Sequence, residues 1–417
     1  MKAKPAILFL LFFAFFLNSP GMGQGNKISF EQNKSWHDIV KKAKIENKYI
    51  FVDCYATWCM PCKYMDNEVF TNEEVIIFIN RNFVSVKLQF DSTKNDSPEI
   101  KNQFSNVNYL RNQYSVKAYP TFLFFNSDGQ IVHRDLGTGA PGEFIELCKK
   151  ALDPKYQYYT QLNRYLTGDK DISFLNTLAI LSMKAFDGEI TAKVMKDFIN
   201  TDPELNNSNV NLIFQTTQSV KDTGFSLIMS NIDKFELIIG NDDLKGKLKQ
   251  LIINSEQENM IGIENWNNQE WNKLYNKLLV KYPQLAEEVI QEVKIQHYNA
   301  VENWFSFADI INQYLSRETI SPNILNNYSW TIFTKCTDIS LLSSALSWSK
   351  RTFENKPESE IDPGYMDTYA NILYKMGKNK EAIEWEKKAQ AIAIKQGASI
   401  DWGQDVIDKI TKGEKTW

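Results

Sequence analysis

The chain has 417 residues, a formal net charge of -4 and five cysteines. That length exceeds what one hydrophobic core usually organises, so two or three domains are expected. The near-neutral charge and the lack of a dense basic cluster argue against nucleic acid as a partner. Five cysteines are too few, and odd in number, for a disulfide-stapled scaffold in a chain of this length.

Residues 1–23 have the pattern of a signal peptide. Lys2 and Lys4 precede the apolar run Ala6 to Leu17, and small residues around Gly23 follow it. The run holds about a dozen residues, whereas a membrane span needs roughly twenty. We therefore expect cleavage near Gly23 and export, with the periplasm as the destination and no stable membrane span afterwards; an uncleaved anchor is the alternative.

Residues 28–152 alternate between helical and strand periodicity, which predicts an α/β domain with the order α-β-α-α-β-α-β-β-α. The first expected elements are a helix capped by Ser35, a strand over 49–55, a helix from Cys62 to about Phe70, and a short helix behind a Thr71/Glu74 capping box. The later ones are a strand over 83–88, a helix begun by Ser97-Pro98 with Ile100, Phe104 and Tyr114 on its buried side, strands over 121–125 and 130–135 joined at Asp128-Gly129, and a closing helix begun by Pro141.

The strand over 49–55 leads directly to a CxxC pair, Cys59-Met60-Pro61-Cys62. Cysteines three positions apart lie on neighbouring faces of one helical turn, close enough to form a small disulfide ring, and this spacing supports thiol-disulfide exchange. A stable structural disulfide or a metal pair is the alternative. Zinc needs two more Cys or His ligands, and none is clustered nearby, so we expect no metal and no cofactor.

Two further residues of the same strand stand out. Asp53 lies six residues before Cys59 in an otherwise apolar run, where an unpaired carboxylate is costly to bury. Cys54 points to the opposite face of the strand, and we interpret it, like Cys148 and Cys336, as a buried apolar residue; a regulatory role or pairing with Cys59 is the alternative for Cys54. The histidines show no ligand spacing and receive no catalytic role: His37, His133 and His297.

Four segments resemble the thioredoxin family in sequence and in order: VDCYATWCMPCK, VSVKLQFD, AYPTFLFF and DGQIVHRDLGTG. The resemblance covers about residues 28–150, and it is strongest to exported thioredoxin-like proteins and to the C-terminal domain of the membrane thiol-reductant transporter. A CxxC at a strand-to-helix junction with a downstream proline beside an apolar strand is a specific combination. It implies a thioredoxin fold, with a central mixed sheet flanked by helices, and thiol-disulfide oxidoreductase activity.

Position and resemblance together imply a role for each residue of the site. Cys59 at a helix N-terminus would be the nucleophile, because unpaired N–H groups and the helix dipole favour a thiolate. Cys62, one turn further and more buried, would be the resolving thiol. Asp53 and Lys87 match the family's buried acid and its lysine partner and would handle the proton of Cys62; a purely structural ion pair is the alternative.

Trp58, Tyr119 and Pro120 are the expected substrate-binding residues. A proline entering an apolar strand cannot donate to the ladder and marks a special bend, such as a cis bond. In the family a cis-proline lies opposite the CxxC, and the backbone beside it pairs with the substrate; an ordinary trans proline, and plain packing of Trp58, are the alternatives. Met60 replaces the family's common Gly, which leaves the direction of electron flow open.

Beyond residue 153 the strand signals fade. Residues 155–320 read as an all-α region of helical hairpins, and residues 321–417 resemble tetratricopeptide repeats, with Trp348 and Trp385 37 positions apart, near the repeat period. A stack of such hairpins commonly presents a concave surface to a peptide or protein. We expect a protein-docking platform, with aromatic side chains that serve only as inter-helix core as the alternative.

Two functions fit these observations. The first is an exported thiol-disulfide oxidoreductase, a reductase or isomerase of disulfide-containing protein clients that serves cell redox homeostasis and is kept reduced by a thiol-donating partner at the membrane. The second is a binding or assembly protein, chaperone-like, in which the helical repeats dominate and the CxxC is secondary.

Overall fold

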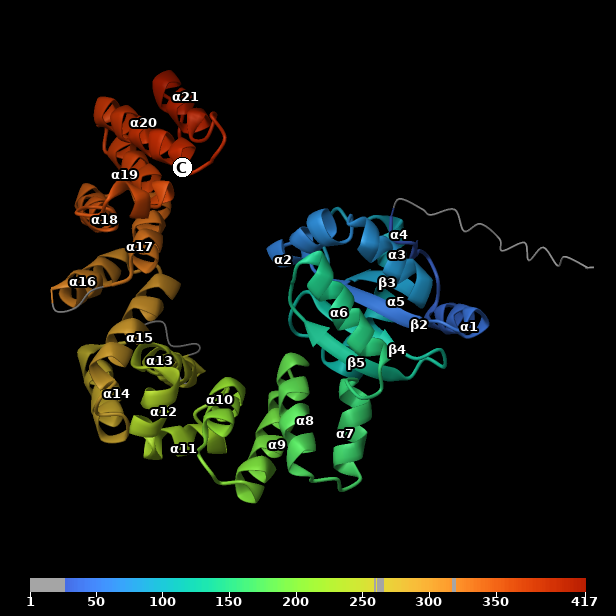
Figure 1. Ribbon diagram of the computed structural model, residues 1–417. Coiled ribbons are helices and arrows are strands. Elements are labelled where there is room, and N and C mark those ends of the chain that lie inside the picture. Colours follow the sequence, from blue (N-terminus) through green and yellow to red (C-terminus); the bar gives the residue numbers. More distant parts are fainter. Residues whose placement is uncertain (1–26, 259, 261–265, 317–319) are drawn as a thin grey trace, which may run out of the picture. The chain divides into compact units, whose positions relative to one another are not determined.

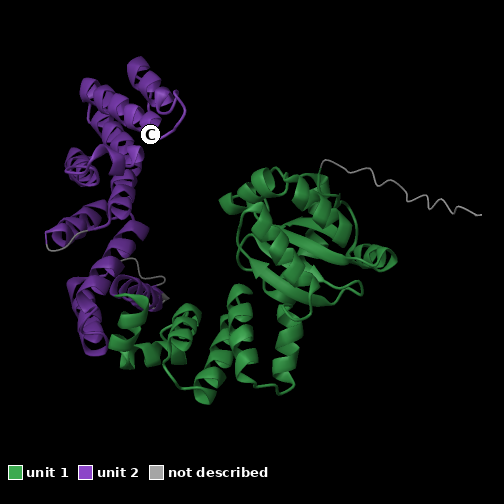
Figure 2. Ribbon diagram, viewed as in Figure 1, with its two compact units in different colours: residues 1–240 green, residues 241–417 purple. Residues whose placement is uncertain are grey.

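The computed structural model describes residues 27–258, 260, 266–316 and 320–417. The expected signal peptide, residues 1–23, lies outside the described residues. The chain divides into two compact units, Met1–Gly240 and Asn241–Trp417 (Figure 2). Within the described ranges, no helix combines the length and the apolar character needed to cross a membrane.

One five-stranded sheet organises the first part of the chain (Figure 1). The strands are β1 (Phe30–Glu31), β2 (Tyr49–Tyr55), β3 (Phe83–Gln89), β4 (Thr121–Phe125) and β5 (Ile131–Leu136). Their order in the sheet is β1-β3-β2-β4-β5; β3 runs parallel to β1 and β2, whereas β4 is antiparallel to β2 and β5. This mixed sheet, with β2 at its centre, is that of the thioredoxin fold and confirms the predicted fold class.

Helices cover both faces of the sheet. The helices on one face are α1 (Trp36–Glu46) and α5 (Phe104–Tyr114). Those on the other face are α3 (Glu73–Asn82), α6 (Pro141–Leu152) and a π-helical turn, η1 (Met65–Val69), which continues the short helix α2 (Met60–Tyr64). The central strands are therefore buried on both sides, which explains why they read as continuous apolar runs rather than as alternating ones.

Strand β2 supplies side chains to both cores. Ile50, Val52 and Cys54 pack on the side of α1 and α5. Phe51 points the other way into an aromatic cluster, where its ring meets those of Phe70, Phe83, Phe122, Phe124 and Phe144. Burying a side chain of this kind contributes roughly 1.5–3 kcal/mol. Asp53 is the one carboxylate of β2, and strand alternation places it on the face of Phe51.

Most of the expected elements are present, and Ser35 caps α1 by accepting the N–H of Asp38 at 3.2 Å. The predicted cap of α3 is wrong by one residue. Asn72 is the N-cap, and its Oδ1 accepts the N–H groups of Glu74 and Val75 at 3.0 and 3.3 Å. The Thr71 hydroxyl instead donates to the carbonyl of Asn67 at 2.7 Å, closing the preceding turn.

The helix expected from Pro98 is in fact two helices, α4 (Pro98–Asn102) and α5. Ile100 on α4 does not join the core, whereas Phe104 and Tyr114 both pack against it, as expected. The buried side of α5 is made by Asn106, Val107 and Leu110. Strand β1 was not predicted, because two residues are too few to show the alternating pattern of a β-strand.

The rest of the chain is helical, as predicted. In the first unit the helices are α7 (Tyr158–Leu166), α8 (Ile172–Lys184), α9 (Gly188–Thr201), α10 (Asn207–Thr216), α11 (Thr223–Ser230) and α12 (Ile232–Ile239). In the second they are α13 (Asn241–Glu258), α14 (Asn268–Lys281), α15 (Ala286–Ala300), α16 (Trp304–Leu315), α17 (Pro322–Lys335), α18 (Ile339–Arg351), α19 (Pro363–Lys375), α20 (Asn379–Lys395) and α21 (Gln404–Lys412), with a 3-10 turn, η2 (Glu358–Glu360). The unit boundary at 240 falls inside the predicted region 155–320, and both the division at 320 and the tetratricopeptide resemblance stay predictions.

The helical part begins in direct contact with the sheet. The N–H of Tyr158, at the start of α7, donates to Nδ1 of the buried His133 on the edge strand β5 at 3.0 Å. Burial, together with Lys150 and Lys184, lowers the pKa of His133 to about 4. The imidazole is therefore neutral at neutral pH, and its Nδ1 can accept the hydrogen bond. His133, which was given no catalytic role, thus connects the start of α7 to the sheet.

Candidate active site

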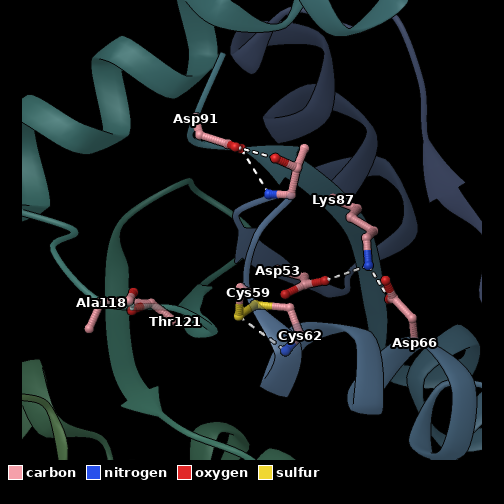
Figure 3. The surroundings of a disulfide bond; sticks show 9 residues. Asp53, Cys59, Cys62, Asp66, Lys87, Asp91, Ala118 and Thr121 are labelled. Atoms are coloured by element: carbon pink, nitrogen blue, oxygen red, sulfur yellow. Dashed lines mark hydrogen bonds and ion pairs between the residues drawn. A yellow bond between two sulfur atoms is a disulfide. The ribbon is translucent and has the colours of Figure 1, made fainter. Parts of the chain in front are cut away.

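Cys59 and Cys62 form a disulfide at the start of α2 (Figure 3). Cys59 is the N-cap of that helix, and its sulfur accepts the N–H of Cys62 at 3.1 Å. Pro61 lies in the first turn, where a missing N–H costs nothing. The loop-to-helix junction thus places the Cys59 sulfur at the free N–H groups of the helix start, as the spacing predicted.

Both cysteines are almost fully covered in the disulfide form. Cys59 is 2% exposed and Cys62 is 3% exposed. The expectation that Cys62 is the more buried of the two is therefore wrong for this state. The reason is that both side chains pack into one small cluster with Ala56, flanked by the rings of Tyr55 and Tyr119.

Directly behind the disulfide lies an ion pair between neighbouring strands. Asp53 on β2 and Lys87 on β3 are register partners, and Nζ of Lys87 is 3.1 Å from Oδ2 of Asp53. Asp53 is only 2% exposed, and its Oδ1 has no hydrogen-bond partner. Its side chain points toward the disulfide (Figure 3). The structure therefore brings Asp53, Lys87 and the two cysteines together.

Burial dominates the charge of this pair. It raises the pKa of Asp53 above its ordinary value of 3.8, and the attraction of Lys87 only partly opposes that shift. Burial also disfavours the Lys87 ammonium, but Asp53 and Asp66 outweigh it and raise the pKa of Lys87. Lys87 therefore stays charged while Asp53 is poised to take a proton.

Asp66 is a residue of the site that the sequence analysis missed. It lies on η1 and binds the Lys87 ammonium by a short hydrogen bond through Oδ1. Lys87 thus has two carboxylate partners, one buried and one partly exposed. The sequence carries no signal for this contact, since Asp66 and Lys87 are 21 residues apart and only the fold brings them together.

A cavity of about 560 Å³ opens beside Lys87. Its wall includes Phe30, Glu31, Tyr55, Gln89 and Ile100. The Lys87 ammonium also lies 4.8 Å from the centre of the Tyr55 ring. The cavity gives solvent a route to the ion pair from the side of β1 and α4. The Lys87 side chain then separates the buried Asp53 carboxylate from the cavity.

The expected substrate-binding residues lie on the other side of the disulfide. The Tyr119–Pro120 peptide bond is cis, as the position of the proline in an apolar strand suggested. The Tyr119 ring meets the Trp58 ring edge-on at 5.8 Å. Trp58 is 68% exposed, and so is Met60. Plain packing therefore does not account for Trp58, which offers an apolar surface next to the cysteines.

The loop that carries Trp58 is fixed by a second residue that the sequence analysis missed. Asp91, just beyond β3, accepts the backbone N–H of Thr57 at 3.0 Å and also binds its hydroxyl (Figure 3). On the facing loop the Thr121 hydroxyl donates to the carbonyl of Ala118 at 2.7 Å. Side-chain hydrogen bonds thus hold both loops beside the disulfide. The Asp91 contact becomes visible only in the folded structure.

The three remaining cysteines are free and buried: Cys54, Cys148 and Cys336. Burial raises the pKa of each thiol. Cys54 packs in the core between the sheet and α1, on the face opposite Asp53, which supports its interpretation as a buried apolar residue. Among the described residues, no three His, Cys, Asp or Glu side chains gather as they would around a metal ion.

Comparison with known proteins agrees with this geometry. A family model described as a thioredoxin-like domain matches residues 37–152. Residues 37–152 are a thioredoxin-like domain. Together with the Cys59–Cys62 disulfide, this match identifies the domain as one of the disulfide oxidoreductase type.

The relatives of the thioredoxin-like domain carry matching names. It is 32% identical over 102 residues to the thiol:disulfide interchange protein DsbD of Colwellia psychrerythraea, covering 24% of this chain and 15% of that one. It is 29% identical over 116 residues to a thioredoxin of Mycoplasmoides gallisepticum, covering 27% of this chain and 97% of that one. Among solved structures, a solution structure from Bacteroides thetaiotaomicron, provisionally described as a disulphide-isomerase, is 34% identical over 30% of this chain and 94% of its own, with a TM-score of 0.26. Most of this chain lies outside each match, and the chain spans less than a fifth of that DsbD relative.

Replacing Asp53 with Asn is expected to stabilise the oxidised protein at neutral pH, by on the order of 1 kcal/mol in the free energy of unfolding. The pKa of Asp53 in the folded protein lies above its value in the unfolded chain. At a pH between these two pKa values, the folded state therefore binds more of the Asp53 proton than the unfolded state does. The wild-type protein consequently loses stability as the pH rises through that window, and the neutral Asn avoids the loss. The advantage should therefore grow from acid pH to a plateau above the folded pKa.

Hydrogen exchange of the β2 amides over a pH series measures this effect within the thioredoxin-like domain. The exposed Glu68, which makes no ion pair with Lys87, provides the matched control Glu68→Gln. A destabilised Asp53→Asn at neutral pH, or an advantage that does not depend on pH, would contradict the assignment of a costly buried carboxylate.

Proposed function

We propose that this chain is an exported thiol-disulfide oxidoreductase that acts on protein disulfides through Cys59 and Cys62. The observation that carries the proposal is the Cys59–Cys62 disulfide at a helix start, directly in front of a buried Asp53–Lys87 ion pair. The names of the relatives, a thiol:disulfide interchange protein and a thioredoxin, support the same chemistry.

The reaction needs two exchange steps. The Cys59 thiolate attacks one sulfur of a client disulfide, so that a Cys59–client bond forms, the client S–S bond breaks, and the second client sulfur leaves as a thiolate that takes a proton from solvent. The Cys62 thiolate then attacks the Cys59 sulfur, forming the Cys59–Cys62 disulfide and releasing the first client sulfur. Two electrons pass from the dithiol to the client.

Asp53 provides the base for the second step. Its Oδ1 has no hydrogen-bond partner and can accept the proton of Cys62, and burial raises its pKa, which makes it a stronger base than an ordinary aspartate. The proton then leaves past Lys87, which lines the cavity beside the ion pair. Asp53 and Lys87 thus serve proton transfer, and Trp58, Tyr119 and Pro120 serve client binding.

The buried carboxylate favours the reducing direction. A protein whose reduced form is stabilised as a thiolate is a strong oxidant. A carboxylate behind Cys62 has the opposite effect, because like charge disfavours the Cys62 thiolate and so favours the disulfide. We infer a reductase or isomerase that a thiol-donating partner returns to the dithiol state by supplying two electrons per turnover.

Export and docking complete the proposal. The basic and apolar pattern of residues 1–23 supports delivery to the periplasm, where protein disulfides are stable enough to be clients. The helices beyond residue 157 support a role in holding clients or the redox partner near Cys59, since stacked helical hairpins commonly bind peptides.

Serine variants of the two cysteines separate this function from that of a binding or assembly protein. Cys59→Ser should abolish reduction of a disulfide probe such as insulin. Cys62→Ser should accumulate client proteins in mixed disulfides on Cys59, because no resolving thiol remains. Turbidity assays and non-reducing gels measure the two effects, with Cys148→Ala as the control. Unchanged reduction and no trapped clients, with partner binding intact, would favour the assembly protein.

Asp53→Asn should slow turnover at neutral pH by about tenfold or more, since removing a general base of this kind typically costs 10²–10⁴. The fold should be preserved, because Asn has the same shape and the Lys87 ammonium keeps Asp66 as a partner. Single-turnover kinetics measure the rates of mixed-disulfide formation and breakdown separately. The rate of breakdown should decrease, and the rate of formation should not. Wild-type kinetics for this variant would refute proton transfer by Asp53.

Redox titration of Cys59 and Cys62 against glutathione tests the direction of electron flow. We expect a reducing potential, closer to that of thioredoxin, about -270 mV, than to that of DsbA, about -120 mV. The fraction of disulfide is measured by thiol alkylation and mass spectrometry. A potential near that of the strong oxidants would overturn the reductase and favour disulfide formation instead.

A further inference from the structure

We propose that Asp66 is a positioning residue that shares the Lys87 ammonium with Asp53 and thereby sets the pH at which Asp53 exchanges its proton. This inference rests on the proposed function, because it concerns the residue that takes the proton of Cys62. Asp66 itself touches neither cysteine sulfur, so its effect on the reaction passes through Lys87.

The geometry around Lys87 carries the inference. Its Nζ lies 3.1 Å from Asp53 Oδ2 and also binds Asp66 Oδ1. The side chain of Asp53 is 3% exposed and that of Asp66 is 39% exposed. One ammonium thus bridges a carboxylate inside the core and a carboxylate that water also reaches.

This arrangement matters when Asp53 gains a proton. A neutral Asp53 no longer balances the ammonium, which lies among the rings of Phe30, Tyr55 and Phe70 and is largely shielded from water. Asp66 keeps the ammonium paired in that state, so protonating Asp53 does not leave an isolated buried charge. The negative charge of Asp66 also directly disfavours a second carboxylate nearby. Both effects make Asp53 a stronger base.

The other titratable groups around the ion pair do not replace Asp66. Within the described ranges, Asp53 and Asp66 are the carboxylates that pair with Lys87. The Tyr55 phenol and Asp91 lie near the pair, and Glu31 and Glu99 line the cavity beside it. The Cys54 thiol lies on the opposite face of β2, and the disulfide lies in front of the pair. Burial raises the pKa of Tyr55 and of Cys54, so both are neutral where Asp53 titrates.

Asp66→Asn in the full-length oxidised protein provides the test. We follow the carboxyl carbon of Asp53 by NMR over a pH series, with Asp53→Asn to identify its signal. The midpoint should move to lower pH, because Lys87 then pairs with Asp53 alone. The matched control is Glu68→Gln, which removes the same charge from the same turn without a contact to Lys87 and should leave the midpoint in place. Asp66→Glu keeps the charge and should restore the wild-type midpoint.

The resolving step gives a second readout in the reduced protein. Below the wild-type midpoint, breakdown of the mixed disulfide should become about threefold faster or more in Asp66→Asn, because more Asp53 is present as the base. A midpoint that stays in place or moves to higher pH in Asp66→Asn would reduce the contact to a surface ion pair and overturn the inference. The NMR titration needs no turnover, so a shifted midpoint in a protein that fails to reduce disulfides would refute the proposed function alone.

Discussion

The burial of one carboxylate on the central strand is the constraint on which the site depends. Asp53 occupies a position of β2 where every neighbour in the strand is apolar and both faces of the sheet are covered. An unpaired charge there would cost several kcal/mol. Lys87 is held opposite it by the parallel register of β2 and β3, and Lys87 in turn pairs with Asp66 and lines a cavity.

The same strand that stabilises the domain also delivers the chemistry. Phe51 and Asp53 lie two residues apart on one face of β2, so the aromatic core and the proposed proton acceptor are supplied by the same face of the same strand. The strand then ends at Tyr55, and the chain turns through the Thr57–Asp91 contact into α2, whose N-cap is Cys59. Because β2 pairs with β3 on one side and with β4 on the other, it holds the carboxylate behind the disulfide, as the proposed proton transfer requires.

The sequence revealed those parts of the site that break a local rule. Asp53 in an apolar strand, Pro120 at the start of another and the CxxC spacing each conflict with ordinary packing, and each marked its position without any knowledge of the fold. Asp66 and Asp91 went unnoticed because an acidic residue near the surface breaks no rule, and only tertiary contacts give it a partner. The same reason explains the shift of the α3 cap to Asn72, which depends on how the preceding turn closes.

We infer that the direction of electron flow, which Met60 leaves open in the sequence, depends more on the buried Asp53 than on Met60 itself. Met60 is exposed and does not belong to the cluster around the sulfurs, so its side chain mainly forms part of the surface presented to a client. Asp53 instead lies behind the disulfide, where like charge acts on the Cys62 thiolate with little screening by water. A buried charge in this position outweighs an exposed apolar side chain, and it opposes the thiolate that an oxidant would need to stabilise.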